Sequence, residues 1–300
     1  MEINSYDWFW QREKGRPCLV AGTAPSSSDF PYADFKGVYI TCGDGPVRFK
    51  ELFKADYWVN ANNIFPIPEK HLETINSFPD TVFIFADTVT YCYKSANPEF
   101  LRKNLKVDWF AFDQRHFGGK PCGDIMLKCC KLLKLYPGRT TLQEYVQHKF
   151  NMPGHYSDGH TVAVHALAFA ILMGCSPIYL QGVELPLYEE DYKYRESSAA
   201  DLLSQPTYLE RFWDVASHPG LWARRARRRL GELQETLFPE DPVHKKSLFY
   251  KAIPYTLADF DYLVGVANAN GQEIYNLSKT STLKKISALK YLDSSLVINE

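Results

Sequence analysis

The segment DGHTVAVHALAFAILMGCSPIYLQGV, residues 158–183, decides the fold of this chain. Its first part predicts a buried helix, because side chains suited to packing recur at helical spacing and the alanines let the backbone approach a sheet closely. Those side chains are Val162, His165, Ala166, Phe169, Ala170 and Met173. The second part, residues 177–183, is a short apolar run that predicts a buried strand. A helix that leads directly into a buried strand is typical of a parallel sheet covered by helices.

The same alternation extends along the rest of the chain. Further runs rich in Val, Ile, Tyr, Phe or Trp occupy residues 18–22, 37–42, 56–60, 81–87, 107–112 and 273–278. Helices are expected over residues 68–78, 124–136 and 257–268, where proline and glycine punctuate the pattern. We therefore predict an α/β protein with a Rossmann-like, mostly parallel sheet and helices on both faces.

The alternation of predicted strands and helices is interrupted once, and this interruption predicts a lid-like insertion. Residues 187–255 hold acidic and tyrosine-rich stretches, several prolines and an arginine run, Arg224–Arg229. We expect residues 1–186 and 256–300 to form one Rossmann-like domain, with 187–255 as an insertion on its acceptor side. The arginine run is either a basic helix that contacts an anionic membrane or a solvated helix paired with nearby glutamates.

Composition excludes several classes of function. The 300 residues are 45% hydrophobic and carry 34 basic against 35 acidic side chains, so no overall field recruits nucleic acid. The longest apolar span, 162–175, is shorter than the roughly 20 residues of a membrane crossing. Seven cysteines without a CxxC pair, and a start that contains Glu2 and Asp7, favour a reduced, cytoplasmic protein. We expect neither disulfides nor a metal site, and we expect His165 to pack in the core. Homo-oligomerisation is left open.

Three predicted strands end in polar loops that suit a ligand. Gly22-Thr23-Ala24-Pro25-Ser26 follows the first, Asp44 lies in the loop after the second, and the third ends in Asn60-Ala61-Asn62-Asn63. In open α/β sheets, ligands bind at the carboxyl ends of the strands. Glycine permits close backbone approach, hydroxyls donate to phosphate, and asparagine suits ribose or a pyrimidine edge. Each loop alone is better explained by ordinary turn and capping chemistry, and only the three together make a ligand as good an explanation.

Taken together, these elements resemble a known family. The segments Thr161-Val162-Ala163, Ala166-Leu167-Ala168, Met173-Gly174 and Ile178 to Glu184 look like the signature of the bacterial sialyltransferases of glycosyltransferase family 42. They look equally like the related motility-associated glycosylation family, once called domain of unknown function 115. The loop 22–26 resembles the G-x-G-P-S element of these families, Asn60 falls where they carry an asparagine, and 271–278 resembles their closing strand. Order and rough spacing agree over residues 19–283.

The resemblance implies a sialyltransferase-like glycosyltransferase. Such an enzyme moves an acidic nonulosonic sugar from a CMP-activated donor to a glycan or protein acceptor, with inversion and without a metal or cofactor. The donor would be bound by Gly22, Thr23, Ser26, Asp44, Asn60, Asn62, Thr161, Gly182 and Glu184. His244 would be the general base, and Tyr188 or Tyr192 would steady the leaving phosphate. A solvated loop histidine is the other interpretation of His244.

The sequence also departs from the family pattern and leaves alternatives. Thr23 and Ala24 replace the usual asparagine and glycine, Val162 replaces a hydroxyl residue, and Glu184 replaces an aspartate. One alternative is a diphosphotransferase similar to pterin pyrophosphokinases, which relatives of the second family resemble. The other is a nucleotide-binding protein without catalytic activity.

Overall fold

The structure is a computed structural model of the whole chain. It describes residues 1–24, 26–27, 30–43, 45, 55–60, 69–87, 102–113, 140–154, 156, 161–184, 247–278 and 281–297. The expected division at residues 186 and 255 stays a prediction, because 185–246 lies outside the described residues.

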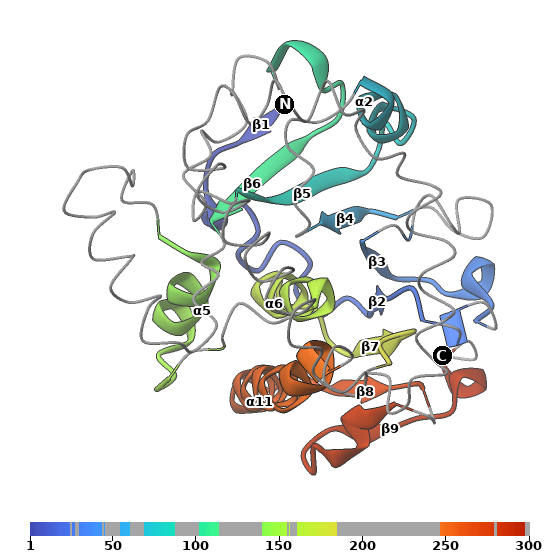
Figure 1. Ribbon diagram of the computed structural model, residues 1–300, viewed down its shortest axis with the longest axis vertical. Helices are drawn as coiled ribbons and strands as arrows, with labels where there is room; N and C mark the ends of the chain where they lie inside the picture. Colours follow the sequence, from blue (N-terminus) through green and yellow to red (C-terminus); the bar gives the residue numbers. More distant parts are fainter. Residues whose placement is uncertain are drawn as a thin grey trace, which may run out of the picture.

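A nine-stranded parallel sheet forms the centre of the molecule, which confirms the predicted fold class (Figure 1). The strand order is β1-β6-β5-β4-β3-β2-β7-β8-β9. The predicted strands appear as β2 Cys18–Ala21, β3 Val38–Cys42, β4 Tyr57–Asn60, β5 Val82–Asp87, β6 Trp109–Asp113, β7 Ile178–Gln181 and β8 Ile274–Asn276. Sequence analysis missed the edge strands β1 Glu2–Ile3 and β9 Lys290–Tyr291, since two residues are too few to show alternation.

The α-helices that cover the sheet are α2 Glu69–Asn76, α5 Leu142–Phe150, α6 Val162–Leu172 and α11 Ser247–Ala269. The predicted helices over 68–78 and 158–174 are thus confirmed with shorter bounds. The helix predicted over 257–268 begins earlier, at Ser247. Helix α5 was not predicted, and the helix expected over 124–136 lies outside the described residues.

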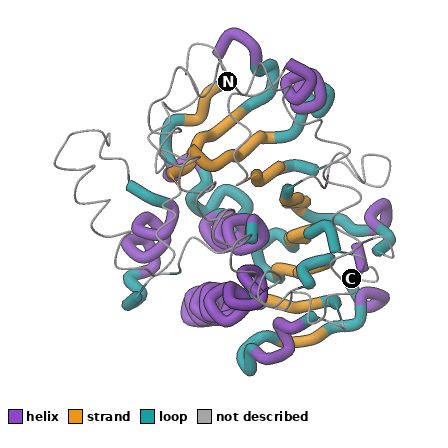
Figure 2. Tube along the Cα trace, in the orientation of Figure 1, coloured by secondary structure: helices purple, strands orange, loops and turns teal. Residues whose placement is uncertain are grey.

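Helices cover both faces of the sheet. In Figure 1, α5, α6 and α11 lie to the left of the stacked strands and α2 lies to the upper right. Figure 2 shows the strands as one continuous layer between them. The largest apolar cluster joins α6 and α11 to the sheet, while Leu72 and Ile75 of α2 pack with Trp58 and Phe83 on the opposite face. This two-sided burial explains why the strands are continuous apolar runs.

Helix α6 is the most deeply buried helix of the described residues. Every side chain from Ala163 to Leu172 is buried, which fits the alanine-rich pattern. His165 is fully buried and packs near Phe112 and Tyr156, with ring centroids 5.2 and 6.0 Å away, so its expected place in the core is confirmed.

The direction of α6 follows from contacts at its last turn. The amide of Gln11 donates to the Leu172 carbonyl at 2.9 Å, and the amide of Cys18, the first residue of β2, donates to the Pro177 carbonyl at 2.9 Å. The end of α6 therefore lies at the amino edge of the sheet. Its beginning, at Thr161, lies at the carboxyl edge, where the polar loops leave the strands.

The described cysteines Cys18, Cys42 and Cys175 are buried free thiols. Burial and a neighbouring Cys175 side chain raise the pKa of the Cys18 thiol. None of the helices in the described part of the chain has the length and hydropathy that a membrane crossing requires.

Candidate functional site

Two glycines bring the exits of the adjacent strands β2 and β7 into contact. The Gly22 amide donates to the Gln181 carbonyl at 2.8 Å, and the Ala24 amide donates to the Gly182 carbonyl at 3.1 Å. A Cβ atom on Gly22 would lie 2.1 Å from the Gly182 carbonyl oxygen. A Cβ atom on Gly182, which has φ +63°, would lie 1.7 Å from Ser27 Oγ. Glycine is thus required at both positions, because the two buried strand exits pack against each other and against Ser27 with no room for a side chain.

Serine side chains hold the loop after β2 in place. Ser27 is fully buried, and its hydroxyl donates to the Gly22 carbonyl at 2.6 Å. The hydroxyls of Ser26 and Ser278 share a hydrogen bond of 2.8 Å, which ties this loop to the segment after β8. The Gln181 side-chain amide also donates to the Ser26 carbonyl. The loop is therefore preorganised, and the Ser26 hydroxyl is already engaged across the edge.

Thr161 begins α6 at the same edge. It is the N-cap residue, and its hydroxyl accepts a hydrogen bond from the Ala163 amide at 3.4 Å, near the upper limit for such a bond. The first turn of α6 contains no acidic side chain. Amides at a helix start attract anions, so this end of α6 is suited to a phosphate or carboxylate.

Four predicted binding residues lie at strand ends along this edge. Asn60 is the last residue of β4 and is buried, with 7% of its surface exposed. Thr23 follows Gly22, and its methyl carbon would lie 3.8 Å from a Cβ atom on Gly45, so the exits of β2 and β3 are also close. The structure thus brings Gly22, Thr23 and Gly182 together, with Asn60 two strands from β2 along the same edge.

Several buried polar atoms at this edge have no hydrogen-bond partner within the described part of the chain. They are Thr41 Oγ1 at the end of β3, Gln181 Oε1 at the end of β7 and Glu184 Oε1 just after it. Buried polar groups are normally satisfied, and a lone one needs an explanation such as a ligand or a water molecule. Thr41 and Gln181 each pair in register with Ala21, whose small side chain lies between them. Gln181 Oε1 and Glu184 Oε1 can accept hydrogen bonds from a hydroxyl-rich molecule, and the Thr41 hydroxyl can donate or accept one.

Sequence analysis missed the contributions of Thr41, Gln181, Ser27 and Ser278. A signal existed for Gln181, which is a polar residue at the end of the apolar run Ile178–Gln181. Ser278 gives no local signal, because its partner Ser26 is 252 positions away in the sequence.

The remaining predicted residues lie outside the described part of the chain. These are Asp44, Asn62, Tyr188, Tyr192, His244 and the arginine run Arg224–Arg229. Their roles stay predictions. Within the described residues, no group of three or more His, Cys, Asp or Glu side chains is placed to hold a metal ion.

Burial dominates the electrostatics beneath the loop after β2. Tyr32 is 3% exposed, and burial raises its pKa to about 12, with the neighbouring Ser27 side chain opposing the shift. Tyr39 donates its phenol to the Phe35 carbonyl at 2.9 Å and to the Tyr32 carbonyl, and burial raises its pKa to about 12 as well. Both phenols are neutral at physiological pH and act as fixed hydrogen-bond groups.

Comparison with known proteins gives matches among solved structures only. No family model matches the chain, and no curated protein is similar enough in sequence to match it. The chain is structurally similar to an alpha-2,3-sialyltransferase from Campylobacter jejuni in apo form, with a TM-score of 0.42 and 14% identity over 92% of this chain and 80% of that one.

Two further solved structures are similar. The sialyltransferase CstII from Campylobacter jejuni, in complex with the substrate analogue CMP-3FNeuAc, has a TM-score of 0.42 and 13% identity over 92% of this chain and 84% of that one. The MAf glycosyltransferase from Magnetospirillum magneticum AMB-1 has a TM-score of 0.33 and 19% identity over 60% of this chain and 26% of that one. The likeness in each case concerns the fold.

Proposed function

We propose that this chain is a sialyltransferase-like glycosyltransferase that uses a CMP-activated acidic sugar. The observation that carries the proposal is the carboxyl edge of the sheet. There, the packed strand exits at Gly22 and Gly182, the start of α6 at Thr161 and the buried Glu184 Oε1, which has no hydrogen-bond partner among the described residues, belong to the same edge. Carboxyl edges of parallel sheets are where nucleotides bind, and the sequence motifs at these positions resemble those of CMP-sugar transferases.

Each group has a chemical task in this proposal. The first-turn amides of α6 and the Thr161 hydroxyl bind the phosphate or the sugar carboxylate. Asn60 offers a donor and an acceptor to the cytosine edge or to the sugar. Glu184 Oε1 accepts from a ribose hydroxyl, which gives this buried carboxylate oxygen the partner it lacks. Gly22 and Gly182 let the exits of β2 and β7 pack together, which fixes the backbone beneath the nucleotide.

The transfer step requires groups from residues 185–246. His244 would remove the proton of the acceptor hydroxyl, which then attacks the anomeric carbon as the bond to CMP breaks. Tyr188 or Tyr192 would donate a hydrogen bond to the phosphate as negative charge develops on it. Direct attack inverts the anomeric centre. The acceptor is a glycan or a protein.

A nucleotide panel tests this proposal. The melting temperature would be measured with CMP, UDP, GDP, ADP and ATP, with and without magnesium. A ligand at 100 times its Kd adds about 2.7 kcal/mol to the free energy of unfolding, so CMP should give a clear rise. The rise should survive EDTA. Stabilisation by ATP and magnesium but not by CMP would instead indicate a diphosphotransferase and overturn the proposal.

Matched threonine variants localise the effect. Thr161→Ala should reduce CMP stabilisation, whereas Thr141→Ala, which removes the N-cap of α5, should leave it intact. Equal CMP shifts in both variants would show that the start of α6 does not bind the nucleotide.

A further inference from the structure

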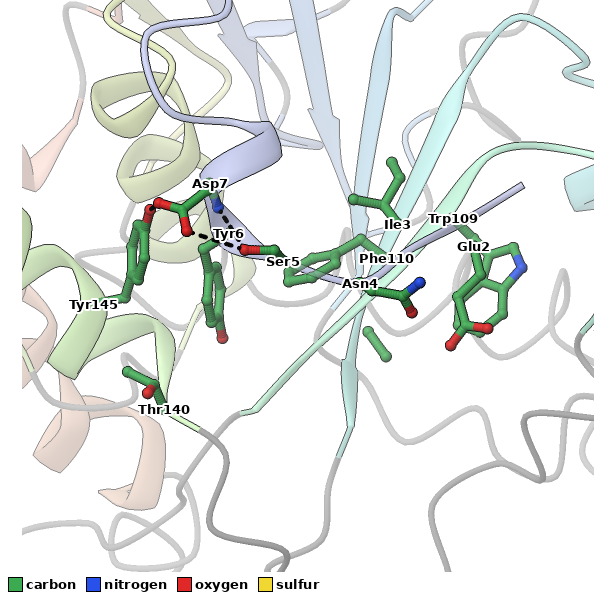
Figure 3. Close-up of a pocket in the computed structure, with 11 residues that line it drawn as sticks. Glu2, Ile3, Asn4, Ser5, Tyr6, Asp7, Trp109, Phe110, Thr140 and Tyr145 are labelled. Atoms are coloured by element: carbon green, nitrogen blue, oxygen red, sulfur yellow. Dashed lines mark hydrogen bonds between the residues drawn. The ribbon is translucent and has the colours of Figure 1, made fainter.

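A pocket lies at the open edge of the sheet, far from the proposed nucleotide site. Its volume is about 350 Å³. It is bounded by β1 and the segment after it (residues 2–7), by residues 109–111 of β6, by Thr140, which precedes α5, and by Tyr145 within α5 (Figure 3). Strand β1 is five positions from β2 in the sheet. At the usual spacing between neighbouring strands, that separation is about 24 Å, and β4, which ends in Asn60, is three positions or about 14 Å from β1. The pocket is therefore a separate site.

Both carboxylates of this pocket are already neutralised. Asp7 Oδ1 accepts from the Lys149 ammonium at 2.7 Å and from the Tyr145 phenol at 2.5 Å. Glu2 Oε2 accepts from Arg102 Nε at 2.5 Å. The Lys149 hydrogen bond, above all, lowers the pKa of Asp7, so the pair is ionised at physiological pH. A pocket whose charges are internally balanced gives neither a cation nor an anion an advantage.

Hydrogen-bonding groups in the pocket nevertheless remain available. Asn4 and Thr140 are exposed, and the Asn4 amide and the Thr140 hydroxyl form no hydrogen bond with the other described residues. Glu2 Oε1 is likewise not used by Arg102. These groups supply donors and acceptors from two separate segments that converge on one hollow. A ligand with several hydroxyl groups can satisfy them simultaneously.

The floor of the pocket is apolar and rigid. Trp109, Phe110 and Tyr6 are almost completely buried, and Tyr6 stacks on Tyr145 with ring centroids 4.8 Å apart. Ligand pockets characteristically combine such apolar walls with a few fixed polar groups. Sugars match both parts, because each ring carries hydroxyls at its rim and C–H groups on its faces.

We propose that this edge pocket binds a neutral saccharide unit. Asn4, Thr140 and Glu2 Oε1 hydrogen-bond its hydroxyls, and the edges of the buried rings contact its C–H face. The volume suits one or two sugar rings. The proposal does not depend on the nucleotide site. If the chain is a glycosyltransferase, a saccharide held about 14–24 Å from the donor site would be a distant part of an extended glycan acceptor.

Saturation-transfer NMR on the full chain tests the pocket with defined probes. The probes are glucose, galactose, N-acetylglucosamine, lactose and maltose, each measured separately, with spermidine as a cationic comparison. At least one saccharide should bind with a Kd in the millimolar range. Asn4→Ala and Thr140→Ala should each weaken that binding about tenfold, as expected for a lost hydrogen bond.

The control is Asn268→Ala, which changes an exposed asparagine on α11. It should bind saccharide like the unchanged chain. The Asn4 and Thr140 variants should keep their melting temperature and any stabilisation by CMP, so failure of the pocket and failure of the nucleotide proposal are distinguishable. No binding by any saccharide, binding unaffected by both pocket variants, or binding of spermidine alone would each overturn the proposal.

Discussion

At the scale of single residues, the contact between Gly22 and Gly182 determines the shape of the candidate site. The two strand exits cross with carbonyl oxygens and amides in direct contact. Gly182 also has a left-handed backbone conformation, φ +63°, which other residues adopt at a cost. Its position is therefore restricted both by conformation and by space.

Gly182→Ala should cost more stability than Gly15→Ala. Both positions have positive φ, at +63° and +72°, but a Cβ on Gly15 meets nothing within 4 Å. Backbone strain alone should cost Gly15→Ala about 1–2 kcal/mol. In Gly182→Ala the new methyl also overlaps buried Ser27, so we expect a loss above about 3 kcal/mol. Urea unfolding measures both values.

The pair of variants separates strain from crowding. Gly182→Ala should also abolish CMP stabilisation if it retains a folded state, whereas Gly15→Ala should preserve it. Equal losses of stability in the two variants would contradict this expectation. They would show that the backbone after β7 can move to accommodate a methyl group beside Ser27.

At the scale of elements, the helices α5 and α6 begin differently. Thr141 caps α5 in a complete capping box: its hydroxyl accepts from the Glu144 amide at 3.1 Å, and Glu144 accepts from the Thr141 amide at 3.0 Å. Thr161 caps α6 through one bond of 3.4 Å. Helix α6 is held by its buried side chains rather than by its cap.

Thr141→Ala should therefore destabilise the chain by about 1–2 kcal/mol, and Thr161→Ala by about 0.5 kcal/mol or less. Chemical denaturation with matched Thr→Ser variants, which keep the hydroxyl, provides the comparison. A larger loss at Thr161 than at Thr141 would mean that the hydroxyl of Thr161 supports the fold, and its assignment to ligand binding would lose its basis.

At the scale of the whole molecule, buried phenols couple stability to alkaline pH. Tyr32 and Tyr39 belong to the cluster that joins β2, β3 and β7 to the loop after β2, and both have pKa values of about 12. Burial also raises the pKa values of Tyr57 and Tyr145. These phenols ionise more readily in the unfolded chain than in the folded one. The equilibrium therefore shifts toward unfolding once the pH exceeds 10, the ordinary pKa of a tyrosine.

The free energy of unfolding should consequently fall as pH rises from 10 to about 12. The sign follows because a raised pKa means that the folded state keeps its proton while the unfolded state loses it. Tyr32→Phe should make the decline shallower by about 1.4 kcal/mol per pH unit, since it removes one such proton. Denaturant unfolding at several pH values measures the slope. Parallel curves for Tyr32→Phe and the unchanged chain would contradict the buried, protonated state of this phenol.

Local pattern was sufficient for much of the architecture. Apolar runs and helical spacing located β2 to β8 and α6 because burial on both faces of a sheet imposes continuous apolar sequence. Glycine at 22 and 182 could be recognised as significant because close backbone approach excludes other residues. The motif resemblance then suggested a nucleotide-sugar site at the carboxyl edge.

Other features were decided only by the tertiary structure. The sequence predicted seven of the nine strands, the helices α2 and α6 and part of α11, and it predicted that the polar strand exits share one edge of the sheet. Tertiary packing decided the strand order, the addition of the two-residue edge strands, the bond between Ser26 and Ser278, and the pocket beside β1. The physical reason is that periodicity records whether a residue faces the core, whereas partners distant along the chain are chosen by how the folded surfaces fit.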